Sequence, residues 1–219
     1  MAKTNLTATT ELVPRARRAT ADNDARRAKD PWSLLPDGVR RSLAKAAVEE
    51  FSKRGFHATP TRDIATRVGM SAAGLYVHYR SKAELLYAIS LIGHEAAQNA
   101  VDTAMLGLIE PAERVRAYVK AFTIWHAVNH TLARVLQYEL RSLSPEHYLT
   151  IAAIRRATEQ QAAKELRPLV RPARDLKIKT RAVLSLGIDV ARWYDPSKEP
   201  DAEAIGEKYA EMIMCMLGK

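Results

Sequence analysis

Apolar residues recur every three or four positions along most of the chain, which is the period of an amphipathic α-helix. No stretch alternates apolar and polar residues long enough to predict a β-sheet. We therefore expect an all-α protein of about nine helices, separated by glycine, proline and capping residues. The predicted helices cover about residues 37–54, 60–68, 72–79, 82–108, 111–129, 131–143, 145–166, 175–194 and 202–217.

Two short helical patterns lie around a tight turn within residues 59–82. The apolar stripe of residues 64–68 ends at Gly69, and Ser71 begins a second pattern. Thr59 and Ser71 are suited to cap the two helices, because a hydroxyl oxygen accepts from the free N–H groups of the first turn. This arrangement predicts a helix-turn-helix, whose second helix enters the major groove of DNA.

The run RDIATRVGMSAAGLYVHYRSKAELL resembles the DNA-binding signature of TetR-type transcriptional regulators. In that family a Gly-Phe pair ends the first helix, here Gly55 and Phe56, and an LYxHF-SK-like run closes the motif, here residues 75–82. Pro60 stands where the family often has a threonine that reaches a phosphate. The resemblance spans about residues 39–86 and implies a three-helix DNA-binding head over residues 36–82.

The first turn of the predicted recognition helix is made of small residues, Ala72, Ala73 and Gly74. Such a helix can lie deep in the groove, where alanine methyls contact thymine methyls, but it reaches few base edges. The resemblance implies that Tyr76, His78 and Lys82 contact phosphate or the groove wall, and Lys82 also stands at a helix N-terminus, which attracts anions. The predicted DNA-binding residues are Thr59, Arg62, Ser71, Ala72, Ala73, Gly74, Tyr76, His78, Tyr79 and Lys82. Arg62 could instead pair with Asp63 or Glu50, and Tyr79 could pack in the head's own core.

Positive charge is concentrated towards the N-terminus. Residues 1–86 carry 16 Lys and Arg against 9 Asp and Glu, which is an excess of seven within a net charge of +9. Residues 1–35 have few large apolar side chains, so we expect a flexible basic arm, or one that forms a helix over residues 16–29 on contact. Such a charge distribution suits a surface that meets DNA phosphates, although a merely solubilising surface is the alternative.

The rest of the chain, residues 83–219, should form a ligand-binding and dimerisation domain, as the TetR resemblance implies. Ser81 and Glu84 predict a capping box at the start of the long helix that joins the head to this domain. The last two helices are apolar on more than one face, which indicates a second partner, although they could also be central core helices of a monomer. The predicted dimerisation residues are Leu184, Ile188, Ala191, Tyr209, Met212, Ile213 and Met216.

Large side chains with a polar tip mark a candidate cavity for a small-molecule effector. The predicted set is Trp125, His126, Asn129, Arg134, Tyr138, Arg141, Tyr148 and Trp193. Arg134, Tyr138 and Arg141 fall on one helical face and could receive a carboxylate or phosphate, or the arginines could pair with Glu139 or Glu146. Residues 187–214 resemble the dimerising end of TetR regulators that respond to acyl-CoA thioesters of lipid or steroid breakdown. That resemblance implies that basic residues within 131–194 meet the CoA phosphates.

Motifs of other classes are absent from the sequence. There is no Gly-rich phosphate loop, no HExxH or GxSxG, and no His/Cys/carboxylate cluster at metal spacing, so we expect neither an enzyme nor a metal or cofactor. The single cysteine, Cys215, lies in an apolar pattern and should be buried. Without a signal peptide or an apolar run of membrane length, the protein is expected to be soluble, cytoplasmic and without a membrane partner. The sequence thus predicts a homodimeric, ligand-responsive regulator that binds double-stranded operator DNA, most simply a repressor. A DNA-binding architectural protein without a ligand is the alternative.

Overall fold

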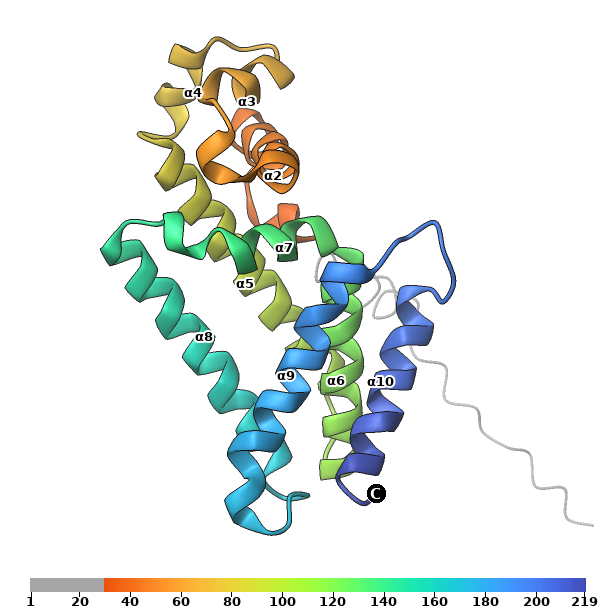
Figure 1. Ribbon diagram of the computed structural model, residues 1–219. Coiled ribbons are helices and arrows are strands. Elements are labelled where there is room, and N and C mark those ends of the chain that lie inside the picture. Colours follow the sequence, from red (N-terminus) through yellow and green to blue (C-terminus); the bar gives the residue numbers. More distant parts are fainter. Residues whose placement is uncertain (1–29) are drawn as a thin grey trace, which may run out of the picture.

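The computed structural model describes residues 30–219, which form nine α-helices and three short 3-10 helices, with no strand among them (Figure 1). The all-α prediction is therefore confirmed. The predicted helix 131–143 is shorter than expected, because the chain tightens into a 3-10 turn after Tyr138. The α-helices are α2 (Val39–Ala58), α3 (Thr61–Arg67), α4 (Ala72–His78), α5 (Lys82–Ala104), α6 (Pro111–Val128), α7 (His130–Tyr138), α8 (Pro145–Leu166), α9 (Leu176–Trp193) and α10 (Ala202–Met216). The 3-10 helices are η1 (Pro31–Leu34), η2 (Leu140–Ser142) and η3 (Ala173–Asp175).

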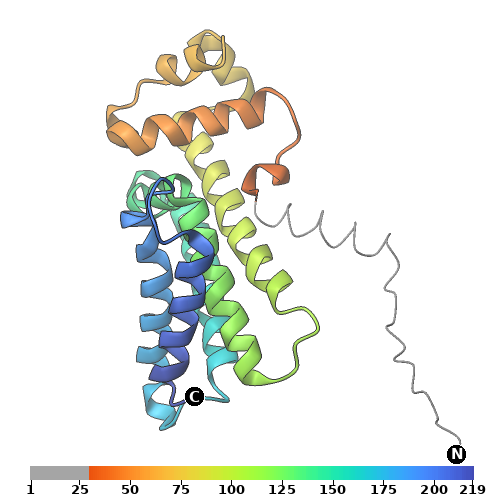
Figure 2. The same ribbon diagram turned by 90° about the vertical axis from the view of Figure 1, so that its right-hand side faces the viewer.

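Helices α2, α3 and α4 form a head at one end of the molecule, and α6 to α10 form a bundle at the other (Figures 1 and 2). Helix α5 starts in the head and runs down into the bundle. Two of the predicted caps hold the head's helices: Ser71 Oγ accepts from Gly74 N at 3.2 Å, and Ser81 Oγ accepts from Glu84 N at 3.0 Å. The Glu84 carboxylate accepts from Arg80 N at 2.8 Å, so the capping box closes one residue earlier than predicted.

Helix α6 is the centre of the bundle and packs against α5, α9 and α10. Glycines allow two of these helices to approach it closely. A Cβ atom at Gly187 of α9 would lie 2.6 Å from Phe122 Cδ1, and one at Gly206 of α10 would lie 2.6 Å from Ile124 Cγ1. Because real Cβ atoms do not come that close, these crossings require glycine.

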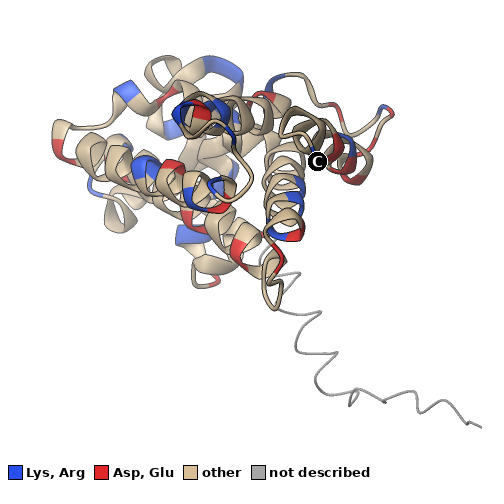
Figure 3. Cartoon of the chain, turned by 90° about the horizontal axis from the view of Figure 1, so that it is seen from below, with Lys and Arg blue, Asp and Glu red and all other residues tan. Residues whose placement is uncertain are grey.

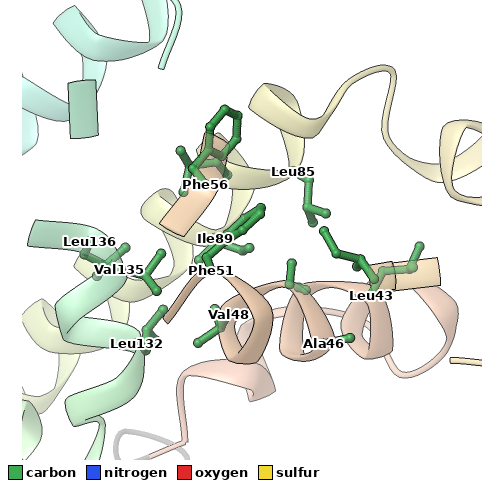
Figure 4. Close-up of a cluster of buried hydrophobic side chains, with 14 of the residues drawn as sticks. Leu43, Ala46, Val48, Phe51, Phe56, Leu85, Ile89, Leu132, Val135 and Leu136 are labelled. Atoms are coloured by element: carbon green, nitrogen blue, oxygen red, sulfur yellow. The ribbon is translucent and has the colours of Figure 1, made fainter. Parts of the chain in front are cut away.

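Helix α7 lies across the bundle beneath α2, and the two helices share a core (Figure 4). Leu132, Val135 and Leu136 of α7 belong to the same buried cluster as Val48 and Phe51 of α2. The head and the bundle are therefore joined by packing as well as by α5. The division into domains at residues 82 and 83 stays a prediction.

Most of the predicted arm, residues 1–29, lies outside the described residues, and so does its predicted helix over 16–29. Its final part is not a flexible arm, because η1 carries Trp32 and Leu34 onto the core. Asp30 caps this turn, its carboxylate accepting from Trp32 N at 3.0 Å. The prediction was wrong for residues 30–35, since this short apolar run gains burial against α5.

The bundle surface mixes both signs of charge, as the view from its free end shows (Figure 3).

Cys215 is exposed rather than buried. The buried stripe of α10 passes through Ala210, Ile213 and Met214, which leaves Cys215 on the outer side of the helix. In the part of the chain that the structure describes, no helix combines the length and the apolar character needed to cross a membrane.

Candidate nucleic-acid interface and effector cavity

Helix α4 is anchored in the head by its inner face. Leu75 and Tyr79 are fully buried, and the Tyr79 hydroxyl donates to the Arg40 carbonyl at 3.1 Å. Arg40 also lies over the Tyr79 ring, 4.6 Å from its centroid. Tyr79 is therefore a core residue, and its predicted DNA contact is not compatible with this position. Its role is to fix the end of α4 against α2.

The outer face of α4 presents small and apolar side chains to the solvent. Ala73 is exposed, Tyr76 is 48% exposed and Val77 is 82% exposed. The Tyr76 hydroxyl lies 3.3 Å from Thr61 Oγ1, which ties this face to the start of α3. Val77 was missed in the sequence, although its spacing of four from Ala73 places both on one face. The remaining predicted residues Ser71, Ala72, Gly74 and His78 are exposed or half-buried on the same helix or at its cap.

Arg62 points away from the head at the start of α3, with a side chain that is 80% exposed. Its Nε atom lies 3.4 Å from a carboxylate oxygen of Asp63. This ion pair is too exposed to hold the guanidinium firmly. Glu50 is instead paired with Arg54 and with Arg67, the latter at 3.0 Å. Arg62 thus stays available at the edge of the exposed face of α4.

Thr59 does not cap α3 and is fully buried. Its Oγ1 donates to the Gly55 carbonyl at 2.7 Å and lies 3.3 Å from the Glu50 carbonyl. The backbone leaves helical geometry at Gly55, whose φ is 79°, and this frees carbonyl groups that Thr59 satisfies. The predicted DNA contact of Thr59 is wrong, because its hydroxyl is engaged inside the head. Pro60 takes the capping position of α3.

Lys82 also differs from its predicted role as a phosphate ligand. Its Nζ donates to the Phe56 carbonyl at 2.6 Å and to the Thr59 carbonyl at 2.9 Å, and it lies 4.4 Å from the Phe56 ring centroid. Partial burial lowers the pKa of this ammonium. The side chain therefore joins the start of α5 to the end of α2 across the head.

Replacing Lys82 with methionine should lower the stability of the protein by about 3 kcal/mol or more, since each of its two bonds from a charged donor contributes about 1.5–3 kcal/mol and the aliphatic stem is kept. The measurement is urea unfolding followed by circular dichroism. An unchanged unfolding midpoint together with weakened DNA binding would restore the phosphate contact and contradict the assignment made here.

A cavity of about 460 Å³ lies in the bundle between α5, α6, α7, α8 and α9. On the side of α5 and α6 the cavity is lined by apolar and aromatic side chains such as Val101, Phe122 and Trp125. On the side of α8 and α9 it is lined by three arginines, Arg155, Arg156 and Arg181. Of these three arginines, only Arg181 forms an ion pair within residues 30–219, and its partner is Glu159 at 3.2 Å. The cavity therefore combines an apolar interior with positive charge.

Both parts of the molecule, the helix-turn-helix head and the helical bundle with its cavity, are similar to parts of known proteins. Residues 43–89 match the family model described as bacterial regulatory proteins, tetR family, and residues 109–217 match the tetracyclin repressor-like C-terminal domain. The chain belongs to the TetR family. It is a DNA-binding transcriptional regulator and not an enzyme.

Solved structures and curated relatives agree with this assignment. A TetR-family regulatory protein from Rhodococcus RHA1 is 38% identical, with 83% of this chain and 98% of that chain covered and a TM-score of 0.77. The transcriptional repressor KstR2 of Mycolicibacterium smegmatis is 25% identical over 193 residues, which are 82% of this chain and 90% of KstR2. AibR, solved with isovaleryl coenzyme A and operator DNA, shares the fold at 22% identity, with 79% of this chain and 96% of that chain covered and a TM-score of 0.71.

Two of the eight predicted effector residues of this TetR protein line the cavity of about 460 Å³, namely Trp125 and His126. Asn129 lines another cavity, of about 350 Å³, between α5 and α6, which Trp125 also borders. Tyr138, Arg141, Tyr148 and Trp193 are exposed and do not line the cavity of about 460 Å³, and half-buried Arg134 does not either. The predicted cluster of Arg134, Tyr138 and Arg141 does not form, because α7 ends at Tyr138 and Arg141 lies in η2.

Polar cavity residues on α5 and α8 were missed in the sequence, above all His94 and Arg155. Burial first, and the nearby charge of Arg155 to a smaller extent, lower the pKa of both His94 and His126 to about 4. Both imidazoles are therefore neutral at pH 7. His94 is a half-buried polar residue between the buried apolar residues of α5, and that interruption was the available signal.

The predicted dimerisation residues fall into two groups. Ala191 and Ile213 are 2% exposed in the protomer's own core, and Leu184 and Ile188 line the cavity. Ala191 and Ile213 are core residues, contrary to prediction, because a helix stripe cannot reveal which side faces inward. The dimer contact of half-buried Leu184 and Ile188 stays a prediction. Tyr209 is half-buried. The exposed large apolar side chains of α9 and α10 are Ile178, Leu186, Trp193, Met212 and Met216.

Proposed function

We propose that this TetR-family protein is a homodimeric repressor that an acyl-CoA thioester releases from its operator. The observation that carries the proposal is the position of α7. Ala133 and Leu136 of this helix line the cavity, while its Leu132 and Val135 pack in one cluster with Val48 and Phe51 of α2 (Figure 4). One short helix is thus shared by the effector cavity and the DNA-binding head.

The DNA side of the proposal rests on the exposed face of α4. Ala73 and Val77 present methyl groups suited to thymine methyls in the major groove, and Tyr76 presents a hydroxyl at its rim. Arg62 at the start of α3 is placed to reach a neighbouring phosphate. A dimer would set two such faces about 34–36 Å apart, one helical turn of DNA, or a multiple of that spacing.

The cavity supports an acyl-CoA effector through its two kinds of lining. Its apolar body suits an acyl group. A groove of about 460 Å³ between α8, η3 and the start of α9 shares Arg156 and Glu159 with the cavity, and it adds Arg174 and Lys177. Such a row of cations at the cavity's edge suits the phosphates of coenzyme A. AibR, which has the same fold, has been solved in complex with isovaleryl coenzyme A.

Coupling between the cavity and the head requires an effector that binds two conformations with different affinity. An acyl group that presses on Leu136 shifts α7, and α7 carries α2 with it through the shared core. Helix α5 is a second connection, because it lines the cavity with His94 and Val101 and holds the head through Lys82. A differential affinity of about 1–3 kcal/mol is typical of such coupling.

Dimerisation is proposed through the outer faces of α9 and α10. Leu186, Trp193, Met212 and Met216 are 37–51% exposed there, and pairing the two helices with their symmetry mates would bury them in a four-helix interface. Replacing Met212 with glutamate should weaken the dimer by about 100-fold or more, because like charges facing each other across an interface cost several kcal/mol. Analytical ultracentrifugation measures this. Leu149→Glu on α8 is the matched control and should stay dimeric, and a dimeric Met212→Glu protein would contradict the interface.

A ligand-independent DNA-binding protein is the alternative, and the open cavity next to α7 counts against it. The test is to select operator DNA from a random library with the full chain. Gel shifts then compare butyryl-CoA, hexanoyl-CoA and free CoA for release of the selected DNA. Release by the thioesters supports the proposal. Undiminished binding at saturating concentrations of each thioester would support the alternative.

A further inference from the structure

The side of the cavity formed by α5 and α6, here called its inner wall, carries polar ring atoms that lack hydrogen-bond partners. Trp125 is 3% exposed, and its Nε1 has no partner within the described residues. The same holds for Nε2 of His94. Both side chains line the cavity. Buried polar atoms are almost always paired, and an unpaired one destabilises the protein. A molecule that occupies the cavity can supply a partner for them.

His126 adds a third polar ring atom, its Nε2, to those of Trp125 and His94. The ring of His126 lies 4.9 Å from that of Trp125, and its Nδ1 is 2.8 Å from the Phe122 carbonyl. A carbonyl oxygen only accepts, so Nδ1 carries the proton of this neutral imidazole. His126 Nε2 is consequently an acceptor, whereas Trp125 Nε1–H is a donor. A hydroxyl is complementary to such a set, because it accepts from Trp125 Nε1–H and donates to His126 Nε2. A keto oxygen can accept from Trp125 Nε1–H but has no proton to donate to His126, and a saturated acyl chain makes neither bond.

Charge favours an oxygen over an amine at this place. Arg155 is near enough to both histidines to disfavour their protonated forms. A ligand cation would meet the same repulsion, whereas the partial negative charge of an oxygen is attracted. The cations proposed for the CoA phosphates, Arg156, Arg174 and Lys177, line the groove outside, so the inner wall is left for the acyl group.

We propose that the cavity selects CoA thioesters whose acyl group bears a hydroxyl, bound by Trp125, His94 and His126, or a keto oxygen, bound by Trp125 and by His94 in the tautomer that carries Nε2–H, over saturated acyl groups of the same length. This inference rests on the proposed function, because it specifies the effector of the same cavity. It assigns His94 and Trp125 a binding role rather than a structural one.

Isothermal titration calorimetry on the full chain tests the selection without DNA. The probes are hexanoyl-CoA and its 3-hydroxy, 3-oxo and 5-oxo derivatives. At least one oxygenated thioester should bind about tenfold or more tightly than hexanoyl-CoA, since a site with buried polar groups rejects ligands that leave them unpaired. The preference should fall to about twofold or less in Trp125→Phe and in His94→Leu. Equal affinity of all four thioesters for the unaltered protein would overturn the inference.

Tyr118→Phe is the matched control. It also removes a buried hydroxyl without a partner, but Tyr118 does not line the cavity, so the preference should remain. If no CoA thioester binds, the proposed effector class fails, and thermal unfolding of the ligand-free protein decides on the inner wall. His94→Leu should keep or raise the melting temperature, by about 2–4 °C. A fall of about 5 °C or more would show a structural partner for His94 and contradict the inference.

Discussion

Replacing Ala73 with glutamate is expected to abolish operator binding while leaving the fold intact. Ala73 is exposed in the first turn of α4, where the helix should lie deepest in the major groove. A carboxylate there faces the DNA phosphates, and like charges brought together at an interface cost several kcal/mol, which weakens binding by about 100-fold or more. The same carboxylate stabilises the helix, because acidic groups favour a helix N-terminus.

Loss of binding in this variant therefore cannot be ascribed to unfolding. Fluorescence anisotropy with the selected operator gives the affinity, and circular dichroism checks the fold. Ala153→Glu introduces the same charge at an exposed position of α8, far along the chain from the head, and should bind the operator normally. If Ala73→Glu binds as well as Ala153→Glu does, α4 is not the helix that enters the groove.

The second large effect is expected at the proposed phosphate groove. Arg156→Gln combined with Lys177→Gln removes two cations that have no ion pair within residues 30–219. Because hydrogen bonds to charged groups contribute about 1.5–3 kcal/mol each, the concentration of acyl-CoA needed to release DNA should rise about 100-fold. Operator affinity without effector should not change, since neither residue is near the head.

The matched control for this pair is Lys164→Gln with Arg167→Gln, at exposed positions close to the end of α8. It removes the same net charge without touching the groove and should respond as the unaltered protein does. A normal response of Arg156→Gln with Lys177→Gln would move the phosphates elsewhere. A loss of operator affinity in that variant would point to DNA rather than CoA as its partner.

The sequence predicted the helices well, because the apolar period and the caps are local. Ser71 and Ser81 cap α4 and α5 as expected. It predicted individual roles less well where a side chain meets backbone that is distant in sequence. Lys82 belongs to the predicted DNA-facing motif, yet it donates to the Phe56 carbonyl, 26 residues away, which only the folded head brings to it. Thr59 donates to the nearby Gly55 carbonyl, because the backbone leaves helical geometry at Gly55.

The cavity shows the same limit in another form. The apolar pattern predicted that α9 has apolar residues on two faces. It could not predict that Leu184 lines the cavity while Leu186 is exposed. Trp125 and His126 were found because polar-tipped aromatic residues in a helix are a local signal. His94 and Arg155 come from two other helices, and their meeting depends on how α5 and α8 cross.

Occupation of the bundle cavity should change the affinity of the head for DNA. Its most direct test is the fluorescence anisotropy of a labelled operator bound to the full chain, titrated with the thioester that calorimetry finds to bind most tightly. The anisotropy should fall to the value of free DNA, and free CoA at the same concentrations should have no such effect. Constant anisotropy under a saturating, calorimetrically verified ligand would contradict it.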